Sequence, residues 1–149
     1  METTLVLLKP DAVQRGLIGE IVNRLEKTGL KITGMKLMQV SQVLANQHYG
    51  EHVGKPFFEG LVSFITSGPI VALAVQGNGA VGIVRKTMGA TNPAESPPGT
   101  VRGDFGIDIG RNLVHGSDSV ESAAREVALF FDEADLVDYS RATDPWITE

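Results

Sequence analysis

The sequence NLVHGSDS, residues 112–119, joins a short apolar run to a polar helix start through a glycine. Residues 113–115 are expected to form a strand, and residues 118–121 resemble a capping box that begins a helix. A helix N-terminus offers free N–H donors and the positive end of a dipole, so it suits a phosphate group. His115 leaves the strand at this point and is therefore placed to contact a phosphate or to attack one.

Glu126 lies roughly two turns into the helix that follows His115. A carboxylate on one ring nitrogen of His115 would fix the tautomer and leave the other nitrogen as the nucleophile. A lone histidine after a strand is more often a hydrogen-bonded structural residue, so the catalytic interpretation depends on the rest of the chain.

Several cationic and hydroxyl side chains outside this segment could surround a polyphosphate. Arginine forks match phosphate oxygens in two-point contacts, and lysine adds a point charge. No GxxxxGK[ST] loop and no HRD or DFG motif occurs, so a phosphoryl-transfer enzyme here would need another architecture. The candidate phosphate-binding residues are Lys9, Arg85, Thr91 and Arg102.

Length and composition predict one ordinary globular domain over residues 1–149. The chain is 42% hydrophobic and 21% charged, which argues against a disordered or fibrous protein. Its net charge is −5, whereas a general nucleic-acid binder usually has a basic surplus. The chain has no cysteine, which excludes disulfides, thiolate zinc sites and cysteine nucleophiles.

Neither a membrane segment nor a leader is expected. The apolar run 70–75 is far shorter than the ~20 residues that cross a bilayer. Residues 1–4 are acidic and polar and lack the basic start of a signal peptide, so we expect a cytoplasmic protein without membrane partners.

The hydrophobic pattern alternates between strands and helices, which fits an α/β sandwich with helices over one sheet and leaves the strand directions open. The last helix is expected to bury Val120, Ala124, Val127 and Phe131 on one face. The predicted strands are 3–8, 31–40, 70–76 and 113–115, the predicted helices are 17–28, 41–49, 57–66, 80–88 and the one beginning near 120, and residues 9–11, 89–110 and 136–149 are expected to be irregular.

Three short motifs have competing interpretations. Residues 77–82 match GxGxxG, but the acidic partner that a dinucleotide site needs is missing, because the nearest candidate, Glu95, lies in the glycine- and proline-rich loop. His48 and His52 match HxxEH, although Gly50 interrupts the helix, so a solvated helix end is favoured over a metal site. The RGD tripeptide at 102–104 is expected to be incidental.

Residues 112–119 resemble the active-site signature of the nucleoside diphosphate kinase family. The resemblance extends over nearly the whole chain, which makes it more specific than any single motif. The other matching segments, in family order, are 9–16, 48–49, 55–58, 67–69, 88–93, 98–105 and the terminal Trp146.

This resemblance implies a ferredoxin-like βαββαβ core with a four-stranded antiparallel sheet covered by helices, a Gly/Pro-rich loop and a C-terminal extension. It also implies a ping-pong transfer of the γ-phosphate from a nucleoside triphosphate to a nucleoside diphosphate through a phosphohistidine. By resemblance, the catalytic residues are His115, Glu126, Ser117 and Lys9, and the substrate-binding residues are Lys9, Tyr49, Phe57, Arg85, Thr91, Arg102 and Asn112.

Among these residues the resemblance assigns the ribose to Lys9 and Asn112 and the base to Phe57. It implies Mg²⁺ held mainly by the nucleotide phosphates and not by dedicated protein ligands. The implied partners are nucleoside di- and triphosphates such as ATP, ADP, GTP and GDP, and the implied assembly is a homohexamer, with a tetramer as second choice. Two alternatives remain: a nucleotide- or nucleic-acid-binding regulator on the same fold, and an NAD-dependent enzyme built on residues 77–82.

Overall fold

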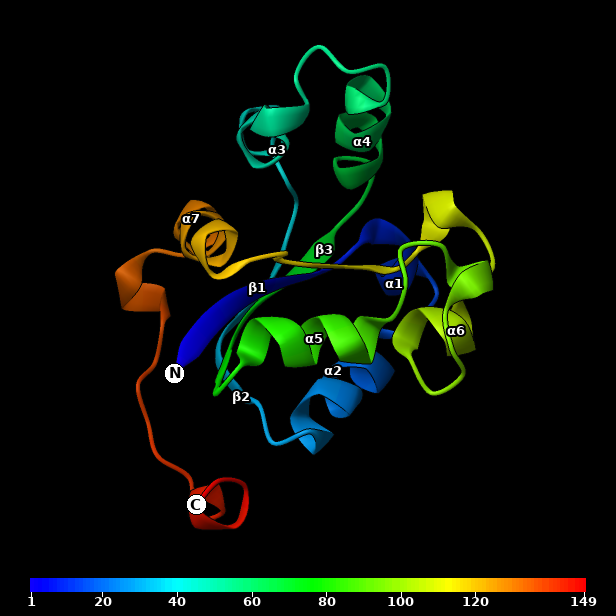
Figure 1. Cartoon of the computed structure of the whole chain (residues 1–149). Coiled ribbons are helices and arrows are strands. Elements are labelled where there is room, and N and C mark those ends of the chain that lie inside the picture. The colour runs from blue at the N-terminus through cyan, green and yellow to red at the C-terminus, as the bar shows by residue number, and fades with distance from the viewer.

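Four strands form one antiparallel sheet, which is the centre of the fold (Figure 1). The computed structural model describes all residues, 1–149. The spatial order of the strands is β2-β3-β1-β4, so each half of the chain contributes one inner and one outer strand, and the two strands of a half do not pair with each other. The strands are β1 (Glu2–Leu8), β2 (Lys31–Met38), β3 (Ile70–Gly77) and β4 (Val114–Gly116).

Helices cover both faces of this sheet (Figure 1). Helices α2 and α5 pack on one face, and α3, α4 and α7 pack on the other. The element order is βαββαβ with α3 and α4 inserted between β2 and β3, which confirms the ferredoxin-like antiparallel sheet. The helices are α1 (Pro10–Gln14), α2 (Ile18–Lys27), α3 (Gln42–His48), α4 (Phe58–Ile65), α5 (Ala80–Met88), α6 (Val101–Phe105) and α7 (Val120–Phe130).

The continuous apolar run of β1 follows from its central position. Successive side chains of a strand point to opposite faces, so a strand covered on both faces is apolar at every position. Leu5 and Leu7 belong to the core beneath α3, α4 and α7, whereas Val6 and Leu8 belong to the core beneath α2 and α5. Leu7 also pairs with His115, which places that histidine beside the central strand.

Two segments that were predicted to be irregular contain helices. Proline at the first position of a helix lacks only a donor that would be unpaired anyway, so Pro10 begins α1 where a simple break was expected. The Gly/Pro-rich loop contains α6, whose N-cap Thr100 accepts a hydrogen bond from the Gly103 N–H. Sequence periodicity missed both because five residues are too few to show a helical period.

Glycine is required where α5 ends and this loop begins. Gly89 has φ +92°, in the region that favours glycine, and a Cβ there would lie 2.0 Å from Ser96 Oγ. The Ser96 hydroxyl instead accepts a hydrogen bond from the Ala90 N–H at 3.1 Å. The chain can therefore turn sharply from α5 into the loop.

The predicted buried face and cap of α7 need correction. Ser119 is the N-cap, since its side chain accepts from the Ser122 N–H, and the cap expected at Asp118 is not formed. Val120 and Ala124 are exposed, and the buried residues of the helix are Ala123, Glu126, Val127 and Phe130. The buried face of the helix differs from the predicted apolar face because it includes the carboxylate of Glu126.

The C-terminal segment after α7 folds back along the edge strand β2. The Val137 N–H donates to the Thr33 carbonyl at 2.8 Å, and the Tyr139 hydroxyl donates to the Ile32 carbonyl at 2.6 Å. Arg141 Nη2 donates to the Gly29 carbonyl at 2.9 Å. Most of the segment lacks regular structure, as predicted, apart from short 3-10 turns at Glu133–Asp135 and Asp144–Trp146, and near its far end Ile147 lies against Gly29, just after α2.

The helices of this fold are short, and none combines the length and the apolar character needed to cross a membrane.

Candidate active site

A cavity of about 340 Å³ lies where the end of β1, the end of α3, the Gly/Pro-rich loop and β4 meet. The segments that line it are far apart in the sequence, so only the fold brings them together. The predicted site residues that line the cavity are Lys9, Tyr49, Arg85, Thr91, Arg102, Asn112, His115 and Glu126.

His115 is held by one ring nitrogen and leaves the other free. Its Nε2 donates to Glu126 Oε1 at 2.5 Å, from the middle of β4 to the buried face of α7. Its Nδ1 makes no hydrogen bond and is not buried. Ser117 is fully buried beneath the pair and donates its hydroxyl to Glu126 Oε1 at 3.3 Å. The arrangement fixes one tautomer and presents the lone pair of Nδ1 to the cavity.

Glu126 is ionised in this environment. Burial alone would raise the pKa of its carboxyl, but the hydrogen bond and the charge of His115, together with the Ser117 hydroxyl, hold the pKa below the ordinary value. An ionised carboxylate can only accept hydrogen bonds, so the proton must stay on His115 Nε2.

Arg102 is a buried cation that the backbone holds in place. It is 6% exposed, and its guanidinium donates to the carbonyls of Asn112, Gly89 and Val114 at 3.0, 3.2 and 2.6 Å. A guanidinium has five N–H donors, so two remain for a ligand. Burial, and then the nearby charge of Arg85, lower the pKa of Arg102 to about 10, so the group is still charged at neutral pH and gains from an anion.

Lys9 follows β1 and lies beside a strained turn. Its Nζ donates to Asn112 Oδ1, and its backbone N–H donates to the Leu113 carbonyl at 2.8 Å. Leu113 has φ +74°, which costs a non-glycine residue about 1–3 kcal/mol. The Asp11 carboxylate accepts the Leu113 N–H at 3.0 Å and stabilises this turn. Lys9 and Asn112 are thereby placed together at one side of the cavity.

The remaining cavity residues keep polar atoms available. Arg85 is exposed, and its Nη1 donates to the Gly116 carbonyl at 3.1 Å. Thr91 is exposed, and its carbonyl accepts from Asn112 Nδ2 at 3.0 Å. Burial raises the pKa of Tyr49 to about 12, so its phenol is a neutral hydrogen-bond donor.

Phe57 does not line the cavity, unlike the other predicted substrate-binding residues. It is 50% exposed, and its ring lies 5.2 Å from the ring of His52, which does line the cavity. The aromatic face is therefore at the surface, just outside the cavity.

Several polar side chains that line the cavity are not among the predicted catalytic and substrate-binding residues. His48 is 4% exposed, and its ring centroid lies 4.8 Å from that of His115 in an edge-to-face arrangement. Burial, and then the charge of His115, lower the pKa of His48 to about 3, so its ring is neutral. The HxxEH pattern paired His48 with His52, whereas the structure places the His48 ring against that of His115. The other polar side chains of this kind are Glu51, His52 and Asp118.

The two remaining short motifs are structural. Gly79 begins α5 with φ +67°, and the Val81 N–H near that end donates to the Glu2 carboxylate at 3.0 Å, so the chain's own carboxylate already occupies the N-terminus. The RGD tripeptide belongs to α6, and its arginine is buried and not available at the surface.

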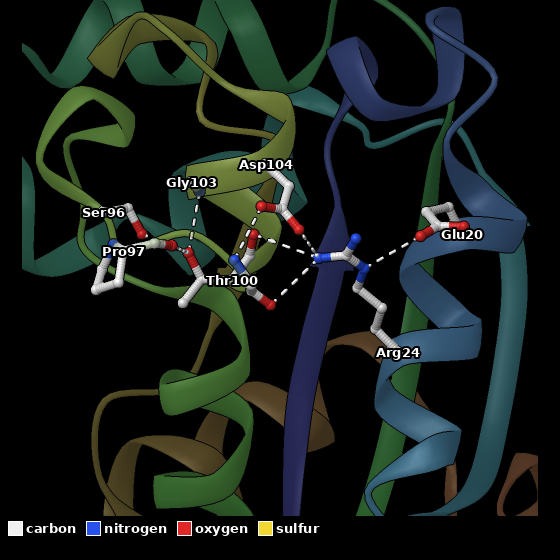
Figure 2. A network of polar contacts seen from close by, with 8 residues as sticks. Glu20, Arg24, Ser96, Pro97, Thr100, Gly103 and Asp104 are labelled. Atoms are coloured by element: carbon white, nitrogen blue, oxygen red, sulfur yellow. Dashed lines mark hydrogen bonds and ion pairs between the residues drawn. The ribbon is translucent and has the colours of Figure 1, made fainter.

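A polar network connects the Gly/Pro-rich loop to α2 (Figure 2). Arg24 bridges Glu20 on its own helix, at 3.1 Å, and Asp104 on α6, at 2.5 Å. The Asp104 carboxylate also accepts the Gly99 N–H at 2.9 Å, and the Thr100 hydroxyl donates to the Pro97 carbonyl at 2.6 Å. Because α6 carries Arg102, this network anchors the loop that supplies the buried cation of the cavity.

A histidine with a fixed tautomer among arginine and lysine side chains is suited to phosphoryl transfer. The model of the family described as "Nucleoside diphosphate kinase" matches residues 2–136. Nucleoside diphosphate kinases of Carboxydothermus hydrogenoformans and Herpetosiphon aurantiacus are 60% and 61% identical over 149 residues, with all of each chain covered. A halophilic nucleoside diphosphate kinase of Halobacterium salinarum, solved with CDP, superposes with a TM-score of 0.97 at 54% identity over 99% of both chains.

The chain therefore belongs to the nucleoside diphosphate kinase family. It is a nucleotide-binding enzyme that transfers a phosphoryl group, and the alternatives of a non-catalytic regulator and of an NAD-dependent enzyme are set aside.

Proposed function

We propose that His115 carries the phosphoryl group between nucleotides. The observation that supports this role is the free, unburied Nδ1 of a ring whose Nε2–H is held by Glu126 at 2.5 Å. In the first half-reaction the Nδ1 lone pair forms a bond to the γ-phosphorus, and the bond from phosphorus to the bridging oxygen breaks, so its electrons leave with the diphosphate. In the second, a terminal oxygen of the acceptor diphosphate attacks the same phosphorus, and the P–N bond returns its electrons to Nδ1.

Glu126 and Ser117 act in this proposal by positioning the histidine. Phosphorylation puts positive charge on the imidazole ring, and the ionised carboxylate on Nε2–H stabilises that charge without taking the proton. Ser117 keeps the carboxylate oriented from the buried side.

The cations of the cavity would stabilise the charge of the transferring group. Arg102 contributes its two unused N–H donors, Arg85 and Lys9 add charge, and the Tyr49 and Thr91 hydroxyls add hydrogen bonds. Most of these groups are held by backbone carbonyls or by Asn112, so little reorganisation is needed when the nucleotide binds.

The nucleoside would extend from the cavity toward solvent. Lys9 and Asn112, which hydrogen-bond each other, are the proposed ribose contacts. Phe57 outside the cavity is the proposed stacking surface for the base. Stacking on an exposed ring accepts every base, which supports broad use of nucleotides such as ATP, ADP, GTP and GDP.

We propose Mg²⁺ as the divalent ion that accompanies the nucleotide. Mg²⁺ prefers oxygen ligands and is usually held by substrate phosphates with one or two carboxylates and water. The cavity fits that mode, because the carboxylates of Glu51 and Asp118 line it while no cage of three carboxylates is present. When bound, the ion would neutralise charge on the phosphates.

The proposed assembly is a homohexamer, with a tetramer as second choice, and the proposed location is the cytoplasm, where nucleoside triphosphates are abundant. The support for assembly is a set of large apolar side chains left exposed on the Gly/Pro-rich loop and on the tail, namely Ile107, which is 90% exposed, and Trp146, also 90% exposed. Analytical ultracentrifugation of the purified chain measures the stoichiometry directly.

The test of the phosphotransfer step uses γ-labelled ATP with Mg²⁺. After quenching, label is expected on the protein, stable to alkali and labile to acid, and added GDP should remove it as labelled GTP. The variant His115→Ala should carry no label. If the wild-type chain binds ADP but never becomes labelled, His115 is not a phosphoryl carrier and a binding role replaces the proposal.

A further inference from the structure

His48 lacks any hydrogen bond although it lies deep inside the active-site cavity. The residue is 4% exposed, and neither Nδ1 nor Nε2 of its ring has a partner. Buried polar atoms without partners are rare in folded proteins and usually indicate a ligand, a water molecule or a functional role. Packing does not need this histidine, because an apolar ring would fill the same contacts with Phe130 and Tyr49 without leaving polar atoms unpaired.

The unpartnered ring of His48 lies near His115 and Glu126, whose imidazole and carboxylate are common metal ligands. One ligand atom from each of His48, His115 and Glu126 lies within 4.8 Å of the other two. The three residues come from the end of α3, from β4 and from α7, so three separate elements converge on one point. The fold therefore assembles two imidazoles and one carboxylate around a space that opens to the cavity.

The chemistry of these ligands selects the metal. Two imidazoles and a carboxylate suit zinc and copper, whereas magnesium prefers oxygen ligands only. Zinc bonds nitrogen at about 2.0–2.1 Å, so its ligand atoms lie roughly 3–4 Å apart. His48 would need to approach by about 1 Å, and the 2.5 Å contact between His115 and Glu126 would need to open by a similar amount.

We propose that His48, His115 and Glu126 form a binding site for a divalent cation of the zinc class, distinct in ligand chemistry from the magnesium carried by the nucleotide. Three protein ligands leave one position of a tetrahedral ion for water. Zinc on Nε2 of His115 requires that nitrogen to give up its proton, which moves to Nδ1, and the resulting Nδ1–H has no lone pair with which to attack phosphorus. A phosphoryl group on Nδ1 in turn prevents Nδ1 from taking that proton, so the site exists only in the enzyme without a phosphoryl group on His115. Zinc and the phosphoryl group therefore exclude each other. The binding itself rests on the geometry, while this exclusion rests on the proposed function of His115.

The direct test is equilibrium dialysis of the whole chain, first freed of metal with a chelator, against zinc chloride without nucleotide. The wild type is expected to bind one zinc ion per chain, and His48→Gln to bind it at least about tenfold more weakly. The matched control is His52→Gln, which removes the other histidine of the HxxEH pattern and is expected to keep wild-type affinity. Millimolar magnesium should not displace the zinc.

A second readout needs no variant and therefore no assumption that a variant folds. The chain has three histidines, so NMR of the ring nitrogens resolves each of them. Zinc is expected to shift the nitrogens of His48 and His115 and to leave those of His52 unchanged. The inference is wrong if the wild type binds no zinc up to about 100 µM. It is also wrong if the His52 nitrogens shift instead, or if His48→Gln, folded by circular dichroism, binds as tightly as the wild type.

The exclusion is measured separately, by labelling with γ-labelled ATP at fixed Mg²⁺ and rising zinc. Wild-type labelling should fall at zinc concentrations that match the dialysis curve, and His48→Gln should need at least about tenfold more zinc for the same fractional loss. Zinc binding without any labelling of His115 would leave the metal site standing and overturn the proposed function. Labelling of His115 with no zinc bound in dialysis would overturn the metal site and leave the proposed function standing.

Discussion

At the residue scale, the proposed phosphoryl transfer depends on which nitrogen of His115 carries the proton. The carboxylate of Glu126 is buried, ionised and 2.5 Å from Nε2, so the proton has no alternative position and Nδ1 is available. A ring free to exchange tautomers would spend part of its time with a protonated Nδ1, and an N–H cannot attack phosphorus.

Replacement of Glu126 tests this dependence. Glu126→Ala should lower the rate of His115 phosphorylation by about 10²-fold, because both tautomer control and charge stabilisation are lost. KM should change much less, since no bond to the phosphates is removed. Rapid-quench labelling with γ-labelled ATP measures the rate. Glu121→Gln, on the exposed first turn of the same helix, is the matched control and should behave as wild type. A Glu126→Ala rate within a few-fold of wild type would contradict the assigned role.

A second prediction at this scale concerns pH. Burial lowers the pKa of Lys9 to about 8, with Asp11 opposing the shift and the positive charge of Arg102 adding to it. Lys9 is cationic below that pKa and neutral above it, so kcat/KM, which reports the free enzyme, should fall as pH rises through about 8. Bound phosphates favour the charged form, so the corresponding fall in kcat should lie at higher pH.

The control for this profile is Lys9→Arg, which keeps the positive charge throughout the range. Its kcat/KM is expected to be lower overall but flat through pH 8. If kcat/KM of Lys9→Arg falls with pH as it does in the wild type, the titration belongs to another group.

At the scale of elements, the position of α6 depends on a helix from another part of the sequence. Arg24 on α2 contacts Glu20, Asp104 and the carbonyl of Gly99, and so fixes the loop whose next turn carries Arg102 (Figure 2). Arg24 and Asp104 are both partly exposed, so solvent screens their attraction and the effect on stability should be modest.

The effect of Arg24 should therefore appear in binding more than in folding. Arg24→Ala is expected to raise KM for nucleotide by about two- to fivefold through added mobility of α6. The midpoint of thermal unfolding should change little. Steady-state kinetics and calorimetry measure the two quantities. Lys27→Ala, an exposed residue on the same helix with no side-chain hydrogen bond, is the matched control. Equal KM values for Arg24→Ala and Lys27→Ala would show that the network does not position the loop.

At the scale of the whole molecule, the C-terminal segment covers the otherwise open edge of the sheet. An edge strand presents unpaired backbone groups that can recruit another chain. Here the Thr33 and Ile32 carbonyls of β2 accept from Val137 and from Tyr139, and Arg141 reaches the carbonyls of Gly29 and Leu30. The tail is thus part of the folded unit up to these contacts.

Arg141 is the residue that should matter most for this docking. Arg141→Ala removes charged hydrogen bonds to two carbonyls and should lower the free energy of unfolding by about 1–2 kcal/mol. Limited proteolysis should also cut the tail faster. Urea unfolding and timed digestion measure the two effects. Arg141→Lys keeps the charge without the fork and should give an intermediate loss. Digestion at the wild-type rate in Arg141→Ala would mean that other contacts hold the tail.

The strands and the long helices of the fold could be predicted from local patterns in the chain. An apolar run between turn residues predicts a strand that is covered on both faces, as in β1 and β3, and α2 follows from the helical spacing of its apolar residues. The sequence also pointed to the pairing of His115 with Glu126, because a strand, a cap and a helix next to each other in the chain leave few arrangements. Signals of this kind arise between residues that are close in the sequence, so they can be recognised without the structure.

Which distant residues face each other could be learned only from the folded molecule. Arg102 became a buried cation because carbonyls from two separate segments, Gly89 and residues 112–114, converge on it, and His48 came to face His115 although they are 67 positions apart in the chain. Phe57 lies outside the cavity, and α7 buries the carboxylate of Glu126 while Val120 and Ala124 are exposed. The physical reason is that burial, hydrogen-bond partners and pKa are properties of a residue's surroundings in space, and those surroundings come from contacts that no local pattern encodes.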